Sequence, residues 1–420
     1  MNTRFMQFVF LCLLASPSVH ARAEAACDVN GAALEQARSF LKSNLLLDGH
    51  NDVPWIIREE SGGDVSMFKL DRRNEFDTDI PRLREGLVGG QFWSVWIPGE
   101  TPVGEYARVQ LEQIDVVRQM LNAHPDVFEL ALRADDIEPI FKRGKIASLI
   151  GMEGGYALNN SLGALRSFYE LGVRYMTLSH NVSLDWVDAA LGEQKLGGLS
   201  SFGRAVVREM NRIGMMVDLS HTSPATMHHA LDESRAPVIW SHAAARALVN
   251  HPRNVPDDVL RRLPVNGGIV MLTFVPSFLS KEVWDMEKTL WDDDVAITLT
   301  REFRDAWLAY DKEHGAKRAS IDQLLDHIEH VREVAGLDHV GIGSDYWGMP
   351  DGPVGLEDVS GFPRLFAGLI CRGWKEEELK KIAGQNMLRV MREVESVAER
   401  MQKQMPPSSA TIDELDKAGN

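Results

Sequence analysis

Eight short runs of apolar residues recur along the chain, and most are apolar almost from end to end. Such runs are typical of strands that are covered on both faces, as in a parallel sheet. They lie at Leu45–Leu47, Gln91–Ile97, Ile146–Ile150, Arg174–Leu178, Met215–Leu219, Val238–Trp240, Gly268–Phe274 and His339–Ile342. Eight is also the number of parallel strands that closes a (β/α) barrel.

Amphipathic stretches with helical spacing separate these runs. They lie at Ala107–Ala123, Gly163–Leu171, Phe202–Ile213, Pro224–Leu231 and Ile321–Ala335. Strands that alternate with helices indicate a parallel α/β fold, and we predict a (β/α)8 TIM barrel. A doubly wound nucleotide-binding sheet is the weaker alternative, because no glycine-rich phosphate loop follows a strand.

The spacing widens between the seventh and eighth runs. The stretch Ser280–Lys317 has mixed charge and carries Trp284, Trp291, Phe303 and Trp307. These aromatic residues predict a helical insertion that folds over the mouth of the barrel or forms a subunit contact.

The first residues have the order of charge, apolar core and small residues that is typical of an export signal. Arg4 precedes an apolar core from Phe5 to Ala15, which is too short to span a bilayer. We therefore predict a signal peptide at 1–25 and a periplasmic or secreted protein, with a buried helix as the alternative. Cys27 and Cys371 could pair in such a compartment, but their spacing does not predict it.

The predicted signal is followed by one barrel domain at 26–400 and a flexible tail at 401–420. The tail combines proline, serine and acidic residues, and no membrane anchor is expected there. The 420 residues carry a formal net charge of −16, which argues against nucleic acid or an anionic membrane as a partner. A soluble enzyme fits the composition best.

Six of the apolar runs end in a residue that can bind a divalent metal or move a proton. These residues are His50 with Asp52, Glu153, His180, His221, His242 and Asp345. Because the carboxyl ends of barrel strands converge on one face, we expect these side chains to form one active site.

The candidate metal ligands are His50, Asp52, Glu153, His221 and His242. His50 and Asp52 stand two residues apart, so on an extended backbone they point to the same side. Alone, such a pair could equally be a surface turn, and Glu153 could be a helix-capping acid. Nitrogen and oxygen ligands without thiolate suit zinc, with manganese or cobalt as alternatives. Five groups are too many for one ion, whereas two ions that share Glu153 as a bridge account for all of them.

Three further residues are candidates for the chemistry. Two bridged ions would hold a hydroxide that attacks the substrate. Asp345 can take the proton of that water and pass it to a leaving group. His180 can stabilise the oxyanion, and Arg253 can hold a substrate carboxylate, although a surface salt bridge is the alternative for Arg253.

Other histidines are expected to be structural. His228, His229, His327 and His330 are interpreted as solvated helix positions, and His251 is left open.

Eight motifs, in this order along the chain, resemble the membrane (renal) dipeptidase family of zinc peptidases. They are DGHND, GMEGG, RYMTLSHN, GLSSFGRAVVREMNRIGMMVDLSH, APVIWSH, RNVPDDVL, GIGSD and GQNMLRV, and the likeness runs from about Leu45 to Glu393. The resemblance implies an amidohydrolase-type barrel with two Zn2+ ions, usually in a homodimer.

The resemblance also implies a role for each site residue. His50 and Asp52 would bind one zinc ion, His221 and His242 the other, and Glu153 would bridge them. His180 and Arg253 would bind substrate, and Asp345 would be the catalytic acid and base.

Two positions depart from the family pattern. The family often reads GIGSDFDG where this chain reads GIGSDYWG, so Trp347 replaces an acid beside Asp345. Val182 stands where mammalian members place a disulfide cysteine. We expect these changes to affect substrate range and dimer geometry more than the chemistry.

The sequence thus predicts an exported zinc dipeptidase. Its substrates would be dipeptides, including those with a C-terminal D-residue, because the family tolerates them. The alternatives are hydrolysis of another amide, a lactam or an ester at the same metal site, or a metal-binding protein without catalysis. The presence of Asp345 and His180 argues against the last of these, since metal binding alone needs neither.

Overall fold

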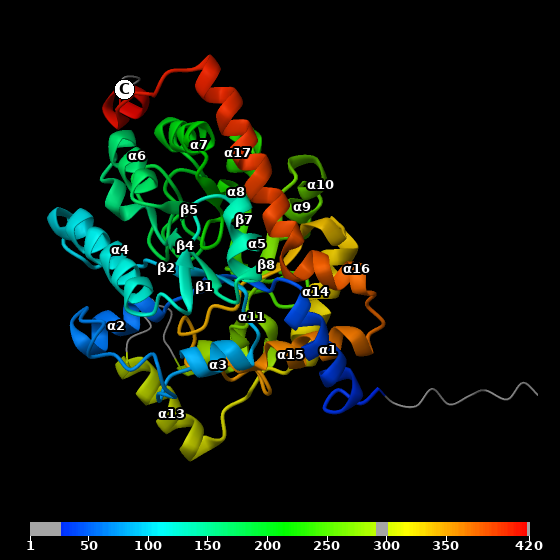
Figure 1. Ribbon diagram of the computed structural model, residues 1–420. Coiled ribbons are helices and arrows are strands. Elements are labelled where there is room, and N and C mark those ends of the chain that lie inside the picture. The colour runs from blue at the N-terminus through cyan, green and yellow to red at the C-terminus, as the bar shows by residue number, and fades with distance from the viewer. Residues whose placement is uncertain (1–26, 291–300, 418–420) are drawn as a thin grey trace, which may run out of the picture.

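The computed structural model describes residues 27–290 and 301–417, and in it eight parallel strands close into a barrel surrounded by helices (Figure 1). The barrel strands are β1 (Leu47–Asn51), β2 (Gly90–Ser94), β4 (Ile146–Met152), β5 (Val173–Thr177), β6 (Met216–Asp218), β7 (Ile239–Ala243), β8 (Ile269–Leu272) and β9 (Val340–Ile342). Strand β2 pairs with both β1 and β4, which closes the ring. The predicted TIM barrel is confirmed.

The largest differences from the prediction concern β1 and one additional strand. Strand β1 begins at Leu47 and continues through polar residues to Asn51, all of them buried. A short additional strand, β3 (Phe128–Leu130), pairs with the first half of β4 outside the ring, while β5 pairs with β4 from Ile150 onward. Apolar patterning therefore located the barrel but not this three-residue edge strand.

The five predicted helices are confirmed as α4 (Tyr106–Ala123), α6 (Leu162–Glu170), α7 (Ser201–Ile213), α8 (Pro224–Glu233) and α14 (Ile321–Ala335). Four of them begin after a serine whose hydroxyl accepts a backbone N–H of the first turn, which is the usual N-cap. The caps are Ser161, Ser200, Ser223 and Ser320.

The remaining α-helices are α1 (Ala32–Ser43), α2 (Val53–Ser61), α3 (Ile80–Glu85), α5 (Ala134–Lys142), α9 (Asp257–Leu260), α10 (Leu263–Asn266), α11 (Pro276–Leu279), α12 (Lys281–Leu290), α13 (Arg301–His314), α15 (Phe362–Cys371), α16 (Glu376–Lys380) and α17 (Asn386–Gln404). Helix α17 packs Met387, Met391 and Val394 into one apolar cluster with residues such as Leu47 and Ile269, at the beginnings of strands. Helix α17 thereby covers the amino end of the barrel and leaves the carboxyl end for the polar residues.

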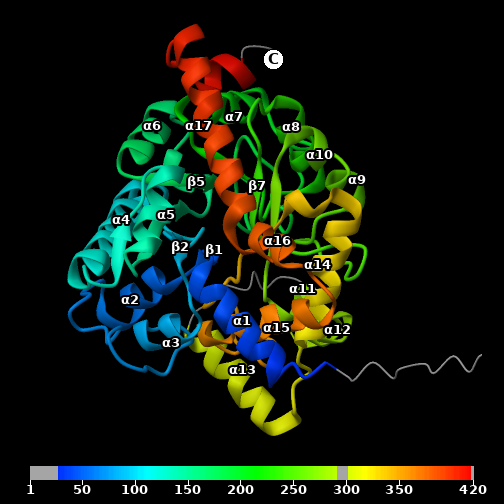
Figure 2. The ribbon, with the colours of Figure 1, turned by 45° about the vertical axis from the view of Figure 1, so that its right-hand side comes forward.

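The predicted insertion is helical, as α12 and α13. Trp284 of α12 lies edge-on to His251, with ring centres 4.1 Å apart. Trp291 and the side chain of Phe303 lie outside the described residues. In both ribbon views α13 and the end of α17 lie at opposite ends of the molecule, so the insertion lies away from the covered end (Figure 1, Figure 2).

A disulfide joins Cys27 to Cys371, with their Cα atoms 5.4 Å apart. It fixes the start of the described chain to the end of α15. The predicted signal at 1–25 lies outside the described residues. In the ranges that the structure describes, no helix is both long enough and apolar enough to cross a membrane.

The stretch predicted as a flexible tail starts inside α17, and its described part packs against α7. Asp416 accepts hydrogen bonds from the Ser200 hydroxyl (2.7 Å) and from the Phe202 N–H (3.1 Å). Ile412 and Leu415 are partly buried against the core. An acidic side chain at a helix N-terminus is favourable, which explains why this acidic segment binds here.

Candidate metal centre and substrate pocket

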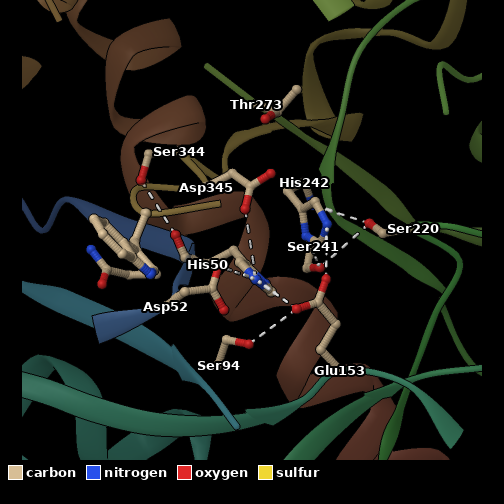
Figure 3. Close-up of polar contacts among 12 residues, drawn as sticks. His50, Asp52, Ser94, Glu153, Ser220, Ser241, His242, Thr273, Ser344 and Asp345 are labelled. Atoms are coloured by element: carbon tan, nitrogen blue, oxygen red, sulfur yellow. Dashed lines mark hydrogen bonds and ion pairs between the residues drawn. The ribbon is translucent and has the colours of Figure 1, made fainter. Parts of the chain in front are cut away.

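The residues predicted at the strand ends lie together at the carboxyl end of the barrel, and Figure 3 shows the polar contacts that join His50, Glu153 and Asp345. One pocket is lined by Asp52, Glu153, His180, His221, His242 and Asp345. His50 lies on β1 and His242 on β7. The other five residues follow a strand directly or within three residues: Asp52 after β1, Glu153 after β4, His180 after β5, His221 after β6 and Asp345 after β9. All the predicted metal ligands are buried. Because the strands run parallel, their carboxyl ends meet at one end of the barrel. Residues as far apart in the sequence as His50 and Asp345 therefore come together there.

Glu153 lies at the centre of this cluster, and its two carboxylate oxygens face different histidines. Oε2 is 3.3 Å from His50 Nε2, whereas Oε1 is 2.8 Å from His221 Nε2 and 3.3 Å from His242 Nε2. The Ser94 hydroxyl donates to Oε2 at 3.2 Å. Glu153 can therefore contribute one oxygen to each of two metal positions.

His50 Nε2 is also close to two other carboxylates, at 3.3 Å from Asp52 Oδ2 and 3.8 Å from Asp345 Oδ1. Three overlapping sets of side chains place their ligand atoms within 4.8 Å of one another. These sets are His50, Asp52 and Glu153, then Glu153, His180 and His221, and finally His50, His242 and Asp345. Asp345 and His180, assigned to catalysis from sequence, are thus near enough to the cluster to reach a metal.

The tautomers of His50 and His221 follow from their outer hydrogen bonds. His221 Nδ1 is 2.9 Å from Asn181 Oδ1, which can only accept, so Nδ1 carries the proton. His50 Nδ1 is 2.9 Å from the Tyr175 hydroxyl, which itself donates to the Gly49 carbonyl at 3.2 Å. In its neutral form each ring therefore carries its proton on Nδ1, which leaves Nε2, the atom that faces Glu153, free to bind a metal ion.

His242 is oriented in the same way. Its Nδ1 is 2.9 Å from Ser241 Oγ, and that hydroxyl donates to Asp218 Oδ2 at 2.5 Å. Asp218 also accepts from Thr177 Oγ1 at 2.7 Å. The Nε2 atoms of His221 and His242 lie 3.0 Å apart. Two lone pairs at that separation repel unless a cation lies between them.

The chemistry of the donor set fits divalent metal ions. Burial lowers the pKa of His221 and of His242 well below the usual value, which keeps both rings neutral. Burial also disfavours charge on His50, but Tyr175, Asp52 and Glu153 raise its pKa well above the usual value. The carboxylate side of the cluster therefore stabilises positive charge. Within the described chain, the buried His50 Nε2 and Asp52 Oδ1 have no hydrogen-bond partner.

Asp345 lies in a strained turn at the edge of the cluster. Its φ angle is 67°, and those of His221 and Trp347 are 65° and 69°, all in the left-handed region that non-glycine residues seldom adopt. A Cβ at Gly348 would lie 1.9 Å from Asp345 Oδ1, so only glycine fits there. Burial raises the pKa of Asp345 well above the usual value, which suits a group that takes up and releases a proton.

Arg253 is buried in the pocket wall, 3% exposed, and does not form the surface salt bridge that was its alternative. Its guanidinium lies 5.2 Å from the centre of the Phe278 ring. Nε and Nη2 have no hydrogen-bond partner among residues 27–290 and 301–417. Burial lowers the pKa of Arg253 to about 10, so it is still charged at neutral pH. Two free donors on a buried guanidinium can form paired hydrogen bonds with a carboxylate.

His180 reaches the cluster from the loop after β5. Its Nε2 is 3.9 Å from Glu153 Oε1, and its ring centre is 4.1 Å from that of His221 and 5.5 Å from that of Trp96. Burial lowers the pKa of His180 to about 4, so the ring is neutral at pH 7. A neutral imidazole can donate one hydrogen bond to a carbonyl oxygen.

Sequence reasoning missed two groups of residues. The first positions the ligands and comprises Tyr175, Asn181, Ser241 and Asp218. The second forms the pocket wall and includes Trp55, Trp96, Phe278 and Glu287, and His251, which the sequence had left open, lies beside them. Asn181 and Ser241 adjoin predicted site residues and could have been found by that proximity, but the wall residues carry no local signal.

The interpretation of His327 as a solvated residue is wrong. The ring is buried, with Nδ1 accepting the Ala245 N–H at 3.0 Å and Nε2 donating to the Leu279 carbonyl at 3.2 Å. His327 thereby links the segment after β7 to α11. Helical spacing alone does not reveal such hydrogen-bond partners. His330, by contrast, contacts Asp257 at 2.8 Å, near the surface.

Known proteins resemble this chain in both sequence and fold. Dipeptidase 3 of Rattus norvegicus is 41% identical over 377 residues, which are 89% of this chain and 70% of that protein. The crystal structure of the probable dipeptidase PvdM from Pseudomonas aeruginosa matches with a TM-score of 0.76 and 26% identity, over 87% of this chain and 99% of that one. A metallo peptidase from Rhodobacter sphaeroides, liganded with a phosphinate mimic of the dipeptide L-Ala-D-Ala, matches with a TM-score of 0.70 and 23% identity, over 84% and 99%.

The family model of membrane dipeptidase, peptidase family M19, matches residues 34–405. This match covers the whole barrel, the metal-binding cluster and the pocket. The chain belongs to the membrane dipeptidase family and is a metallo-dipeptidase.

Proposed function

We propose that this metallo-dipeptidase is exported and holds two zinc ions per chain, bridged by Glu153. His50 and Asp52 would hold one ion, and His221 and His242 the other. The observation that carries this proposal is the division of the Glu153 oxygens between His50 on one side and His221 with His242 on the other. When bound, two such ions supply an activated water as nucleophile and polarise the carbonyl of the scissile bond.

The other site residues act directly on the substrate. Arg253 pairs with the C-terminal carboxylate of the dipeptide and thereby fixes the distance from that carboxylate to the peptide bond. His180 donates a hydrogen bond to the carbonyl oxygen, which gains negative charge in the transition state. Asp345 accepts the proton from the attacking water and transfers it to the amine that leaves.

The buried position of Arg253 also explains the proposed preference for dipeptides. A carboxylate bound to this side chain belongs to the residue directly after the scissile bond, so a longer substrate would have no terminal carboxylate at that point. We extend the proposal to dipeptides with a C-terminal D-residue. The phosphinate mimic of L-Ala-D-Ala in the Rhodobacter sphaeroides metallo peptidase is in keeping with it.

Export is supported by two features of the chain. The first residues have the pattern of a signal peptide. The Cys27–Cys371 disulfide is typical of proteins in oxidising compartments. Assembly as a homodimer rests on the family resemblance alone, and light scattering coupled to size-exclusion chromatography measures it directly.

The test combines metal analysis with a substrate panel. The purified protein is expected to contain two zinc ions per chain and to hydrolyse L,L- and L,D-dipeptides faster than N-acyl amino acids, lactams or simple esters. Glu153→Gln, which removes the bridging charge with little change of shape, is expected to bind neither ion firmly. A metal-replete protein that hydrolyses lactams or esters but no dipeptide would refute the assignment.

A further inference from the structure

Glu287 is a buried acid in the pocket wall that the proposed chemistry does not use. It stands on α12 of the insertion, is 7% exposed and lines the same pocket as Arg253. Its only hydrogen-bond partner in the described part of the chain is the Ser277 side chain on α11. A buried carboxylate is costly to ionise without a cation, so a cationic group of a ligand in this pocket would be stabilised beside it.

A continuous set of contacts places Glu287 on the Arg253 side of the pocket. Phe278, which follows Ser277, lies under the Arg253 guanidinium at 5.2 Å and against the His251 ring at 4.3 Å. Trp284, one helical turn before Glu287, packs edge-on against the same His251 ring at 4.1 Å. Glu287 and Arg253 therefore line the same pocket and are linked through one aromatic wall.

On the proposed function, the carboxylate at Arg253 belongs to the second residue of the dipeptide. The side chain of that residue branches from the same Cα that carries the carboxylate, so it would begin on the side of the pocket that Arg253 and Glu287 line. The α-amino group of the first residue lies beyond the scissile carbonyl, towards Glu153. On this arrangement Glu287 would lie nearer to the second residue than to the first.

We propose that Glu287 is a specificity-determining residue that selects dipeptides whose second residue carries a cationic side chain, such as lysine. The ammonium group would pair with the Glu287 carboxylate, while the aliphatic part of the side chain packs on the apolar wall formed by Phe278 and Val275. This inference rests on the proposed function, because it requires the dipeptide carboxylate at Arg253.

The ionisation state of Glu287 is compatible with this role. Burial raises the pKa of Glu287 to about 7, so the carboxyl group is ionised at pH 8 even without a partner. A bound cation favours the ionised form further. Measurements at pH 8 therefore test the charged state of the residue.

The test compares dipeptides that differ by a single ammonium group. Values of kcat/KM are measured at pH 8 for L-Ala-L-Lys and L-Ala-L-norleucine, and for L-Lys-L-Ala and L-norleucyl-L-Ala. The native protein is expected to prefer lysine over norleucine at the second position by about tenfold, the size of one buried charge-assisted hydrogen bond. Glu287→Gln is expected to abolish that preference while L-Ala-L-norleucine is hydrolysed at the native rate within about twofold.

Two variants serve as controls. Glu282→Gln removes an acid from the same helix, but Glu282 is exposed and 3.7 Å from Lys317, so the preference is expected to persist. Glu287→Asp retains the charge on a shorter side chain and is expected to restore part of the preference.

An unchanged lysine to norleucine ratio in Glu287→Gln would overturn the inference, and so would a change confined to the first position. Both outcomes differ from failure of the proposed function, in which the native protein hydrolyses none of the four dipeptides.

Discussion

The guanidinium of Arg304 lies 4.9 Å from the centre of the Trp347 ring. Arg304 belongs to α13 of the insertion, whereas Trp347 stands two residues after Asp345. The Trp347 ring also lies edge-on to Phe76, and the backbone N–H of Trp347 donates to Asp77 Oδ2 at 2.8 Å. Trp347, which stands in place of the family acid, therefore links the insertion to the loop that carries Asp345.

Replacement of Arg304 by methionine is expected to lower kcat by about three- to tenfold, since a cation–π contact is worth roughly 0.5 to 2 kcal/mol. The zinc content should not change, because Arg304 touches no ligand. Steady-state kinetics and elemental analysis of the same preparation measure both quantities. Lys312→Met, on the same helix but exposed, is the control, and an equal loss in both variants would contradict the explanation.

Asp345→Asn is expected to retain two zinc ions and to lose about 10²- to 10⁴-fold in kcat, the usual contribution of general acid and base catalysis. The amide keeps the shape of the side chain but cannot take up the proton. Elemental analysis decides the interpretation. Loss of an ion would mean that Asp345 is a ligand, which its distance of 3.8 Å from His50 Nε2 permits.

Arg253→Met is expected to lower kcat/KM for dipeptides with a free carboxylate by about 30- to 100-fold, as is typical when a buried charged hydrogen bond is lost. Hydrolysis of the corresponding dipeptide amides should change little. The ratio of the two rates is the readout. If free acids and amides lose activity equally, the guanidinium has a structural role and does not bind the carboxylate.

Cys27→Ser is expected to lower the free energy of unfolding by roughly 2 to 4 kcal/mol, because the reduced chain gains entropy in the unfolded state. Thermal unfolding with and without a reductant measures the effect. Reductant should lower the melting temperature of the native protein and leave that of the variant unchanged. Activity of the folded variant is expected to stay native, since the disulfide joins the N-terminal segment to α15, outside the pocket.

The sequence was sufficient for the barrel and for the identity of the clustered residues. A run such as Met215–Leu219 is apolar because both its faces are covered, and His221 follows it because the chemistry lies at strand ends. Glu153 was predicted as the bridge from the number of ligands. Its two oxygens face His50 and His221, and the bridging role itself stays a prediction.

Other features depend on contacts between distant parts of the chain. Glu287 looks like any acid on a charged helix, and only the packing of α12 on α11 buries it. His327 has the spacing of a solvated residue until its partners Ala245 and Leu279 are known. The docking of Asp416 on α7 joins residues more than 200 positions apart, which no local pattern reports.

The disulfide between Cys27 and Cys371 has a topological consequence. Every residue proposed here to hold metal, substrate or proton lies between those two cysteines, so the whole site belongs to one covalently closed ring. A single cut by an extracellular protease in an exposed loop of that ring would open it without releasing a fragment. The severed pieces would stay tethered, and a nicked enzyme would migrate as two bands only after reduction.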